Sequence, residues 1–102
     1  MKEFYRARRW EQLREKILRR DGYMDAEAKR YGKHIPATVV HHIFPLEEFP
    51  EYAFAPWNLI SVSRETHNTF HDRNTDALTK KGIDLLKRTA RQNGIEIPLR
   101  YE

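Results

Sequence analysis

Apolar side chains recur at helical spacing near the start of the chain. Trp10, Leu13, Ile17 and Leu18 follow the i, i+3, i+7, i+8 pattern of one helical face, and arginines and glutamates fill most positions between them. Asp21-Gly22 follows this pattern and is typical of a helix end. The pattern predicts an N-terminal helix over about residues 6–20, followed by an irregular connection over residues 21–37.

Two short apolar segments lie in the middle of the chain. The β-branched segment from Thr38 to Ile43 is bounded by prolines, which favours a short strand. A loop rich in proline and aromatic residues follows, and Leu59-Ile60-Ser61-Val62 predicts a second strand. Ser63 is a good N-cap for a helix that begins at Arg64.

A second amphipathic pattern lies near the C-terminus. Ile83, Leu85, Leu86 and Ala90 share one helical face, and Gly94 stands where a helix would end. The pattern predicts a C-terminal helix over about residues 75–93. Helices at both ends of the chain and two strands between them indicate an α+β fold.

Composition limits the classes of protein that fit these elements. The chain has 102 residues, of which 39% are hydrophobic and none is cysteine. This length is enough for one core, so we expect a single domain over residues 1–102. No apolar run approaches the roughly 18 residues of a membrane span, and the first residues lack the apolar segment of a secretory signal, so we expect a cytoplasmic protein with no membrane partner. Without cysteine, histidines and carboxylates are the candidate metal ligands and bases.

The net charge of +4 is unevenly distributed along the chain. Residues 1–20 contain eight Lys or Arg and three Glu, and residues 72–100 contain seven Lys or Arg and four Asp or Glu. Residues 43–58 contain three Glu and no basic residue. Two basic flanks can bind a phosphate backbone, but solvated helix faces explain the same pattern.

Four of the five histidines fall in two groups, His41-His42 and His67-x-x-x-His71. The second pair lies at i, i+4 on a predicted helix, so both rings project from one face and can bind one ion. Neighbours on a strand point to opposite faces, so one ring of the first pair can join that ion while the other points elsewhere. Ordinary packing explains the same spacing. We interpret His34, which lies outside both groups, as a surface residue.

A wider motif connects these histidines. His42, Asn58 and His67 occur in the order His–Asn–His, separated by 16 and 9 residues, in the contexts Val-Val-His-His-Ile-Phe-Pro-Leu, Trp-Asn-Leu-Ile and Thr-His-Asn-Thr-Phe-His. With the upstream helix that runs from Trp10 to Gly22, they resemble the HNH endonucleases, the ββα-metal nucleases, and particularly the small phage-type and bacterial members. The likeness covers about residues 5–73. It implies a ββα-metal core over about residues 36–73, made of an antiparallel hairpin and a helix and flanked by the N-terminal and C-terminal helices.

The chain departs from this family pattern in one respect. Many members carry two Cys-x-x-Cys pairs that bind a structural zinc, and the matching positions here are Met24 with Glu27 and Ser63 with Thr66. The resemblance therefore implies that the zinc knuckle is absent. We expect packing and hydrogen bonds to link the connection over residues 21–37 to the core instead.

The resemblance also implies roles for individual residues. His42 is the general base that takes a proton from the attacking water, and Asn58 orients it. His41, His67 and His71 hold one divalent metal ion. Three imidazoles favour Mn²⁺, Ni²⁺, Co²⁺ or Zn²⁺ over Mg²⁺, which prefers oxygen ligands. The implied products are a 5′-phosphate and a 3′-hydroxyl.

DNA is the expected partner, and the candidate phosphate contacts are Arg8, Arg9, Arg14, Arg19, Arg20 and Arg64. Nothing resembles a base-reading module, so we expect low sequence specificity.

Two functions fit these residues. One is a DNA endonuclease that nicks or cuts both strands. The other is a non-catalytic module that binds metal and DNA as an accessory to a phage terminase or another DNA-processing complex, although an activated base beside a metal site favours the first. The sequence leaves the oligomeric state open.

Overall fold

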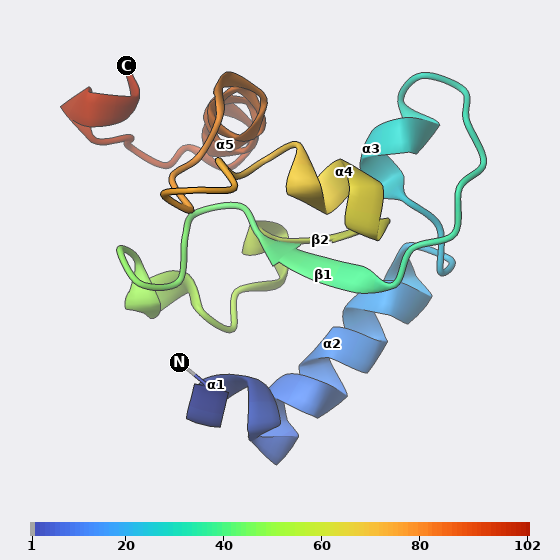
Figure 1. The fold of residues 1–102 in the computed structure, drawn as a ribbon. Coiled ribbons are helices and arrows are strands. Elements are labelled where there is room, and N and C mark those ends of the chain that lie inside the picture. The colour runs from blue at the N-terminus through green and yellow to red at the C-terminus, as the bar shows by residue number, and fades with distance from the viewer. Residues whose placement is uncertain (1) are drawn as a thin grey trace.

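The computed structural model describes residues 2–102, without the side chain of Lys2 (Figure 1). Short and long helices surround a single two-stranded sheet. In chain order the elements are α1 (Lys2–Arg6), α2 (Arg8–Arg20), α3 (Ala26–Lys29), β1 (Val39–His42), η1 (Pro50–Tyr52), η2 (Pro56–Asn58), β2 (Leu59–Val62), α4 (Arg64–Asn68), α5 (Lys80–Asn93) and η3 (Leu99–Tyr101). No helix within residues 2–102 is long and apolar enough to cross a membrane.

The two strands form an antiparallel hairpin at the centre of the molecule. Val39 pairs with Val62 at one end of the hairpin, and His42 pairs with Leu59 at the other. The Ser63 hydroxyl accepts a hydrogen bond from Thr66 N at 3.1 Å and so caps α4, which begins at Arg64. The α+β class and the ββα core with flanking helices are thereby confirmed.

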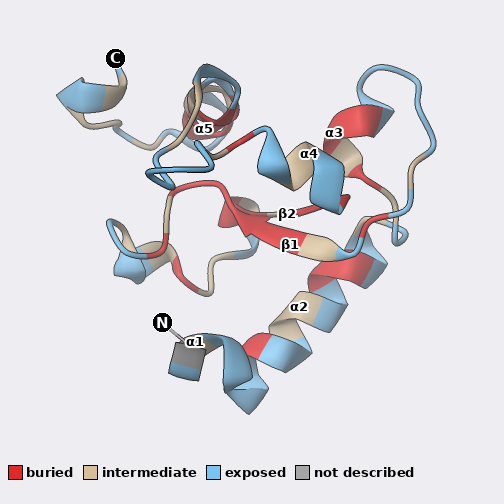
Figure 2. Ribbon diagram, in the orientation of Figure 1, coloured by how far each residue is buried: buried red, intermediate tan, exposed pale blue. Residues whose placement is uncertain are grey.

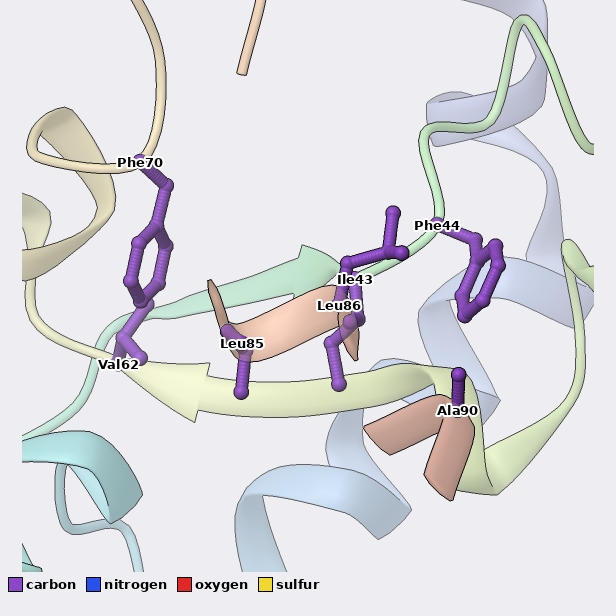
Figure 3. Close-up of a cluster of buried hydrophobic side chains, with 7 residues drawn as sticks. All are labelled: Ile43, Phe44, Val62, Phe70, Leu85, Leu86 and Ala90. Carbon is purple, nitrogen blue, oxygen red and sulfur yellow. The ribbon is translucent and has the colours of Figure 1, made fainter. Parts of the chain in front are cut away.

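The flanking helices cover opposite faces of the hairpin (Figure 1). Val40 and Leu59 face α2 and pack with Trp10 and other buried residues of that helix. Val62 belongs to a second cluster that includes Phe70 and Leu86, drawn in Figure 3. The buried residues in Figure 2 therefore lie between the hairpin and the helices on either side of it. Successive side chains on each strand point to opposite faces of the hairpin and therefore toward different clusters. The adjacent histidines on β1 consequently face different environments.

The N-terminal helix differs from the expected single element over residues 6–20. Ala7 adopts an extended conformation, with φ −66° and ψ 138°, and separates α1 from α2. Ala7 is the N-cap of α2, and its methyl side chain forms no capping hydrogen bond. The break turns α1 away from the axis of α2 (Figure 1), and Phe4 contacts Trp10 with ring centroids 5.2 Å apart and Phe54 with ring centroids 5.1 Å apart. Tertiary packing of aromatic residues thus overrides continuous helix formation.

Two further elements differ from the sequence expectation. The connection over residues 21–37 contains a short helix, α3, because the Asp25 carboxylate accepts a hydrogen bond from Ala28 N at 2.8 Å. Helix α5 begins at Lys80 rather than near residue 75, because Thr79 caps it through Gly82 N. The Asp72 carboxylate accepts hydrogen bonds from the backbone of residues 74 and 75 and holds that segment in a turn. The helix ends at Asn93, as expected, with Gly94 at φ 65°.

Hydrogen bonds join α3 to the core at the positions where many family members carry cysteine. Asp25 is fully buried, and its second carboxylate oxygen accepts a hydrogen bond from Ser63 N at 2.9 Å. The nearby Glu27 is 4% exposed and forms ion pairs with Arg30 and Arg88. The carboxylate of Asp25 therefore links the connection to the beginning of α4.

Candidate metal centre and active site

Three histidines from separate segments converge on one point. His41 comes from β1, His67 from α4, and His71 from the segment that follows α4. Each offers one ring nitrogen, and these three atoms lie within 4.8 Å of one another. Four-coordinate ligand nitrogens at zinc-like distances are about 3.3 Å apart. Small side-chain movements are therefore enough for the three rings to share an ion.

His71 reaches this group by a different route from the one expected. The i, i+4 spacing predicted two rings on one helix, but α4 ends at Asn68. His71 instead forms an isolated β-bridge with Leu78. Its Nδ1 lies 3.1 Å from the backbone carbonyl of Asp76 and donates a hydrogen bond to it. This bond leaves Nε2 of His71 as the nitrogen that can bind a metal.

Burial favours the neutral form of the His41 and His67 imidazoles. Burial lowers the pKa of His41 well below its usual range, and the neighbouring His67 and His71 rings lower it further. Burial and the His71 ring also lower the pKa of His67, although Asp76 opposes this change. Neutral imidazole is the form that binds a metal ion.

The three rings fit a divalent ion. Nε2 of His41 is buried and has no hydrogen-bonding partner among the described residues. Burying an unpaired polar nitrogen costs roughly 1–3 kcal/mol, which a bound ion can offset. Three neutral nitrogen donors match ions of intermediate softness.

His42 projects from the opposite face of β1 and is held on two sides. Its ring stacks on the indole of Trp10, with centroids 4.9 Å apart and planes inclined by 22°. Its Nε2 lies 3.1 Å from the backbone carbonyl of Ala53. Since the carbonyl can only accept, Nε2 carries the hydrogen and Nδ1 is left with a lone pair. Burial lowers the pKa of His42, and the bond to Ala53 only partly opposes this.

Asn58 lies beneath the loop that follows His42. It is fully buried, its Oδ1 accepts a hydrogen bond from Phe44 N at 2.7 Å, and its Nδ2 donates to the carbonyls of Phe44 and Tyr52. Asn58 O also accepts a hydrogen bond from Ile43 N at 2.8 Å. These bonds hold the backbone next to His42, while the Asn58 side chain itself contacts backbone groups rather than the imidazole.

The three metal-ligand candidates and His42 line one cleft of about 700 Å³. Tyr5 of α1 and Arg14 of α2 line the same cleft, together with Glu47 and Asp76. Burial and these two carboxylates raise the pKa of the Tyr5 phenol, so Tyr5 is a hydrogen-bond donor. The sequence did not predict that Tyr5 lines the cleft or that Trp10 stacks on His42. No local pattern connects an N-terminal helix with a histidine more than 30 residues away.

The six candidate arginines occupy different environments. Arg14 lines the cleft and donates to Thr38 O at 2.7 Å. Arg9 lies 3.7 Å from the ring centroid of Phe54. Arg20 donates to Asp21 and to the carbonyls of Pro56 and Leu59, which favours a structural role for its guanidinium. The remaining three, Arg8, Arg19 and Arg64, are exposed.

The structure is similar to a crystal structure of the HNH endonuclease of the deep-sea thermophilic bacteriophage GVE2 with manganese ion. The two chains are 31% identical, the match covers 66% of this chain and 73% of that chain, and the TM-score is 0.64. No protein-family profile matches the chain. No curated protein matches it either. The structural relative shows that this chain belongs to the HNH endonuclease family.

Proposed function

We propose that this protein is a divalent-metal-dependent DNA endonuclease that hydrolyses phosphodiester bonds with low sequence specificity and leaves a 5′-phosphate and a 3′-hydroxyl. One observation carries the proposal: a neutral, oriented imidazole shares a cleft with three convergent metal-ligand candidates. The manganese ion named for the phage relative supports a metal-dependent reaction.

His42 acts as the general base in this proposal. Its Nε2–H donates to the Ala53 carbonyl, so Nδ1 accepts the proton of a water that attacks the phosphorus. Its lowered pKa keeps the ring unprotonated at neutral pH. Trp10 restricts rotation of the ring, and Asn58 holds the backbone that follows it.

His41, His67 and His71 would hold the divalent ion. When bound, the ion supplies Lewis-acid stabilisation of the charge that develops on the phosphate and on the departing 3′ oxygen. The hydrogen bond from His71 Nδ1 to Asp76 O orients that ring for binding. We expect Mn²⁺, Co²⁺, Ni²⁺ or Zn²⁺ to bind better than Mg²⁺ because all three donors are nitrogens.

Arg14 is the proposed phosphate contact inside the cleft, and the exposed Arg8, Arg19 and Arg64 are proposed contacts outside it. One guanidinium nitrogen of Arg14 is anchored on Thr38 O. The anchored guanidinium therefore needs little ordering when it binds a phosphate.

A plasmid assay tests the proposal. Supercoiled plasmid with Mn²⁺ should become nicked or linear, and a chelator should abolish the conversion. His42→Ala should abolish cleavage while Mn²⁺ binding, measured by calorimetry, is retained, whereas His67→Ala should weaken Mn²⁺ binding itself. Plasmid that stays supercoiled with Mn²⁺, Co²⁺, Ni²⁺ and Mg²⁺ would overturn the endonuclease proposal and favour a non-catalytic DNA-binding accessory. Normal cleavage by His42→Ala would overturn the assigned base.

A further inference from the structure

A continuous exposed segment begins at the last residue of α3 and continues toward β1. We call residues Lys29–His34 the basic loop. All six residues are exposed, and the loop protrudes from the rest of the molecule (Figures 1 and 2). It contains Lys29, Arg30, Lys33 and His34, and the sequence has no acidic residue from Ala28 to Leu46.

The side chains of the basic loop are available for an outside partner. Lys29 and Lys33 have no ion-pair partner among residues 2–102, although Arg30 pairs with Glu27 at 3.1 Å. The ring of Tyr31 is 67% exposed, and the Arg30 guanidinium lies 5.6 Å from its centroid. Basic side chains around an exposed aromatic ring are a combination that binds nucleic acid, through phosphate neutralisation and stacking.

The backbone holds this loop in a defined shape. Ala28 O accepts hydrogen bonds from Tyr31 N and Lys33 N, and Gly32 takes φ 75°, which completes a tight turn at the end of α3. Asp25 N donates to Ile35 O at 2.7 Å and closes the base of the loop. A preorganised loop loses less conformational entropy on binding than a flexible one.

The basic loop is also connected to the cleft by a short stretch of chain. Thr38, five residues after Lys33, lines the cleft and is bonded to Arg14. Five residues span at most about 18 Å, which is about five base pairs of duplex DNA. A duplex with one phosphate in the cleft can therefore pass within reach of Lys33. Lys29 lies close to Lys33, because Gly32 N donates a hydrogen bond to Lys29 O at 3.0 Å across the turn.

We propose that the basic loop is a second DNA contact, which binds the backbone of duplex DNA within about five base pairs of the phosphate in the cleft. This inference rests on the proposed function, since it assumes that the cleft accepts a phosphodiester. Lys29 and Lys33 neutralise phosphates, and the ring of Tyr31 packs against the sugar–phosphate backbone. The loop adds affinity for long duplexes and takes no part in the chemical step.

Binding measurements with a charge-matched control test the inference. Lys29→Ala/Lys33→Ala and the control Lys80→Ala/Arg91→Ala, on α5, each remove two positive charges from exposed positions. Both are made in the His42→Ala background, which retains the metal-ligand histidines, and binding to a 30-base-pair duplex is measured over a range of salt concentrations. Each lost phosphate contact should reduce the slope of log K against log salt by about 0.9, so the loop variant should lose about 1.8. An unchanged slope, or the same change in the control, would overturn the proposal.

Duplex length and Tyr31 provide two further readouts. The loop variant should lose much less affinity for a 6-base-pair duplex than for the 30-base-pair duplex, because a 6-base-pair duplex centred on the cleft extends only about three base pairs to either side. Tyr31→Ala should weaken binding of the long duplex several-fold, and Tyr31→Phe should restore it, since packing against the sugars of the backbone needs the ring but not the hydroxyl. Equal loss on short and long duplexes would contradict a contact outside the cleft.

Failure of this inference is distinguishable from failure of the proposed function. If the plasmid is cleaved with Mn²⁺ and the loop variant binds like the control, only the second contact is wrong. If the plasmid is never cleaved but the loop variant still loses affinity and salt dependence, the DNA contact stands and the endonuclease proposal fails.

Discussion

The indole of Trp10 stacks on the imidazole of His42, with ring centroids 4.9 Å apart and planes inclined by 22°. The hydrogen bond to Ala53 O restrains one atom of the imidazole, but it leaves the ring able to rotate about that bond. The stack removes this freedom, because rotation would separate the two faces. Phe4 contacts both rings from α1, at 5.2 Å from Trp10 and 5.7 Å from His42. The N-terminal helices therefore form one wall of the site.

Trp10→Leu should lower the single-turnover cleavage rate by roughly 10- to 100-fold, because a misaligned base reacts poorly. Mn²⁺ affinity should be unchanged, since Trp10 does not contact the three metal-ligand histidines. Trp10→Phe keeps a stacking face and should retain most of the rate. The control is Trp57→Leu, which removes an aromatic ring that packs on Phe44 and Tyr52 instead.

A double-mutant comparison separates positioning by Trp10 from general stability. Any residual cleavage rate that His42→Ala retains should fall little further with Trp10→Leu, because the ring that Trp10 positions is absent. Equal losses in both backgrounds, or a loss that matches the fraction of unfolded protein, would show that Trp10 acts only on folding.

Metal preference should follow the nitrogen donor set. We expect faster cleavage with Mn²⁺, Co²⁺ or Ni²⁺ than with Mg²⁺, because the three ligand candidates are all imidazoles. His41→Asp replaces one nitrogen donor with a carboxylate oxygen and should raise the rate with Mg²⁺ relative to the rate with Mn²⁺. Equal wild-type rates in the two ions, measured at saturating metal, would contradict a site with nitrogen donors alone.

The pKa shifts of the histidines predict how stability changes with pH. Burial lowers the pKa of His41, His42 and His67 in the folded chain, so the unfolded chain binds protons more readily. The metal-free protein should have its full stability above about pH 6.5 and lose stability as the pH falls through the lowered folded-state pKa values. Thermal unfolding in chelator from pH 8 to pH 5 measures this. His41→Asn, which cannot titrate, should flatten the dependence, and stability that rises toward pH 5 would contradict it.

The same shifts move the expected pH profile of cleavage. An ordinary imidazole would lose activity as a base below about pH 6.5. Since burial lowers the pKa of His42, the acid limb should lie below that value. An acid limb at or above pH 6.5, or a cleavage rate that never falls down to the pH at which the protein unfolds, would count against His42 as the base.

Gly82→Ala should destabilise the protein although Gly82 lies inside a helix. Helix propensity alone predicts a gain of about 1 kcal/mol. A Cβ at this position would lie 2.5 Å from the backbone oxygen of Phe70 and 3.0 Å from Leu78. We expect a net loss of about 1–3 kcal/mol in the free energy of unfolding, measured by chemical denaturation. Gln92→Ala, on the exposed part of the same helix, should change it by less than about 0.5 kcal/mol.

Asp25→Ala should be strongly destabilising. The change removes the acceptor for Ser63 N and Ala28 N, and each buried unpaired group costs about 1–3 kcal/mol. Burial by itself would raise the pKa of this carboxyl, but hydrogen bonds from Ser63, Thr66 and Ala28 lower it, so the removed group is a carboxylate. Denaturation midpoints compared with those of Asp84→Ala, a change at an exposed ion pair, test this. Similar small losses in both variants would show that the Asp25 bonds contribute little.

Several features of the fold followed from local patterns in the sequence. The apolar spacing around Trp10 and Leu86 indicated the two long helices, and Ser63 and Gly94 marked a helix start and a helix end. These signals act within a few residues, because a cap or one turn of helix involves only neighbours in the chain. The order of His42, Asn58 and His67 likewise lies in the sequence, and it was enough to indicate the family.

Local patterns did not determine where helices break. A helix could continue through Ala7 and through the segment before Thr79. At both positions, contacts with other residues hold the backbone in a non-helical conformation. At Ala7 the partners are the rings of His42 and Phe54, which contact Phe4 of α1. Before Thr79, the Asp72 carboxylate and the bridge between His71 and Leu78 hold the chain out of the helix.

The sequence by itself determined which residues are available for chemistry, and the tertiary structure decided how they are arranged. Adjacent positions on β1 send His41 and His42 to opposite faces, yet both line one cleft because the helices and the loop after α4 close around the strand end. His71 joins the metal-ligand candidates from beyond the helix that was expected to carry it. The ring of His42 is oriented by Trp10, a residue 32 positions earlier in the chain. Contacts between residues so far apart arise only when the core forms, since no local energy term connects them.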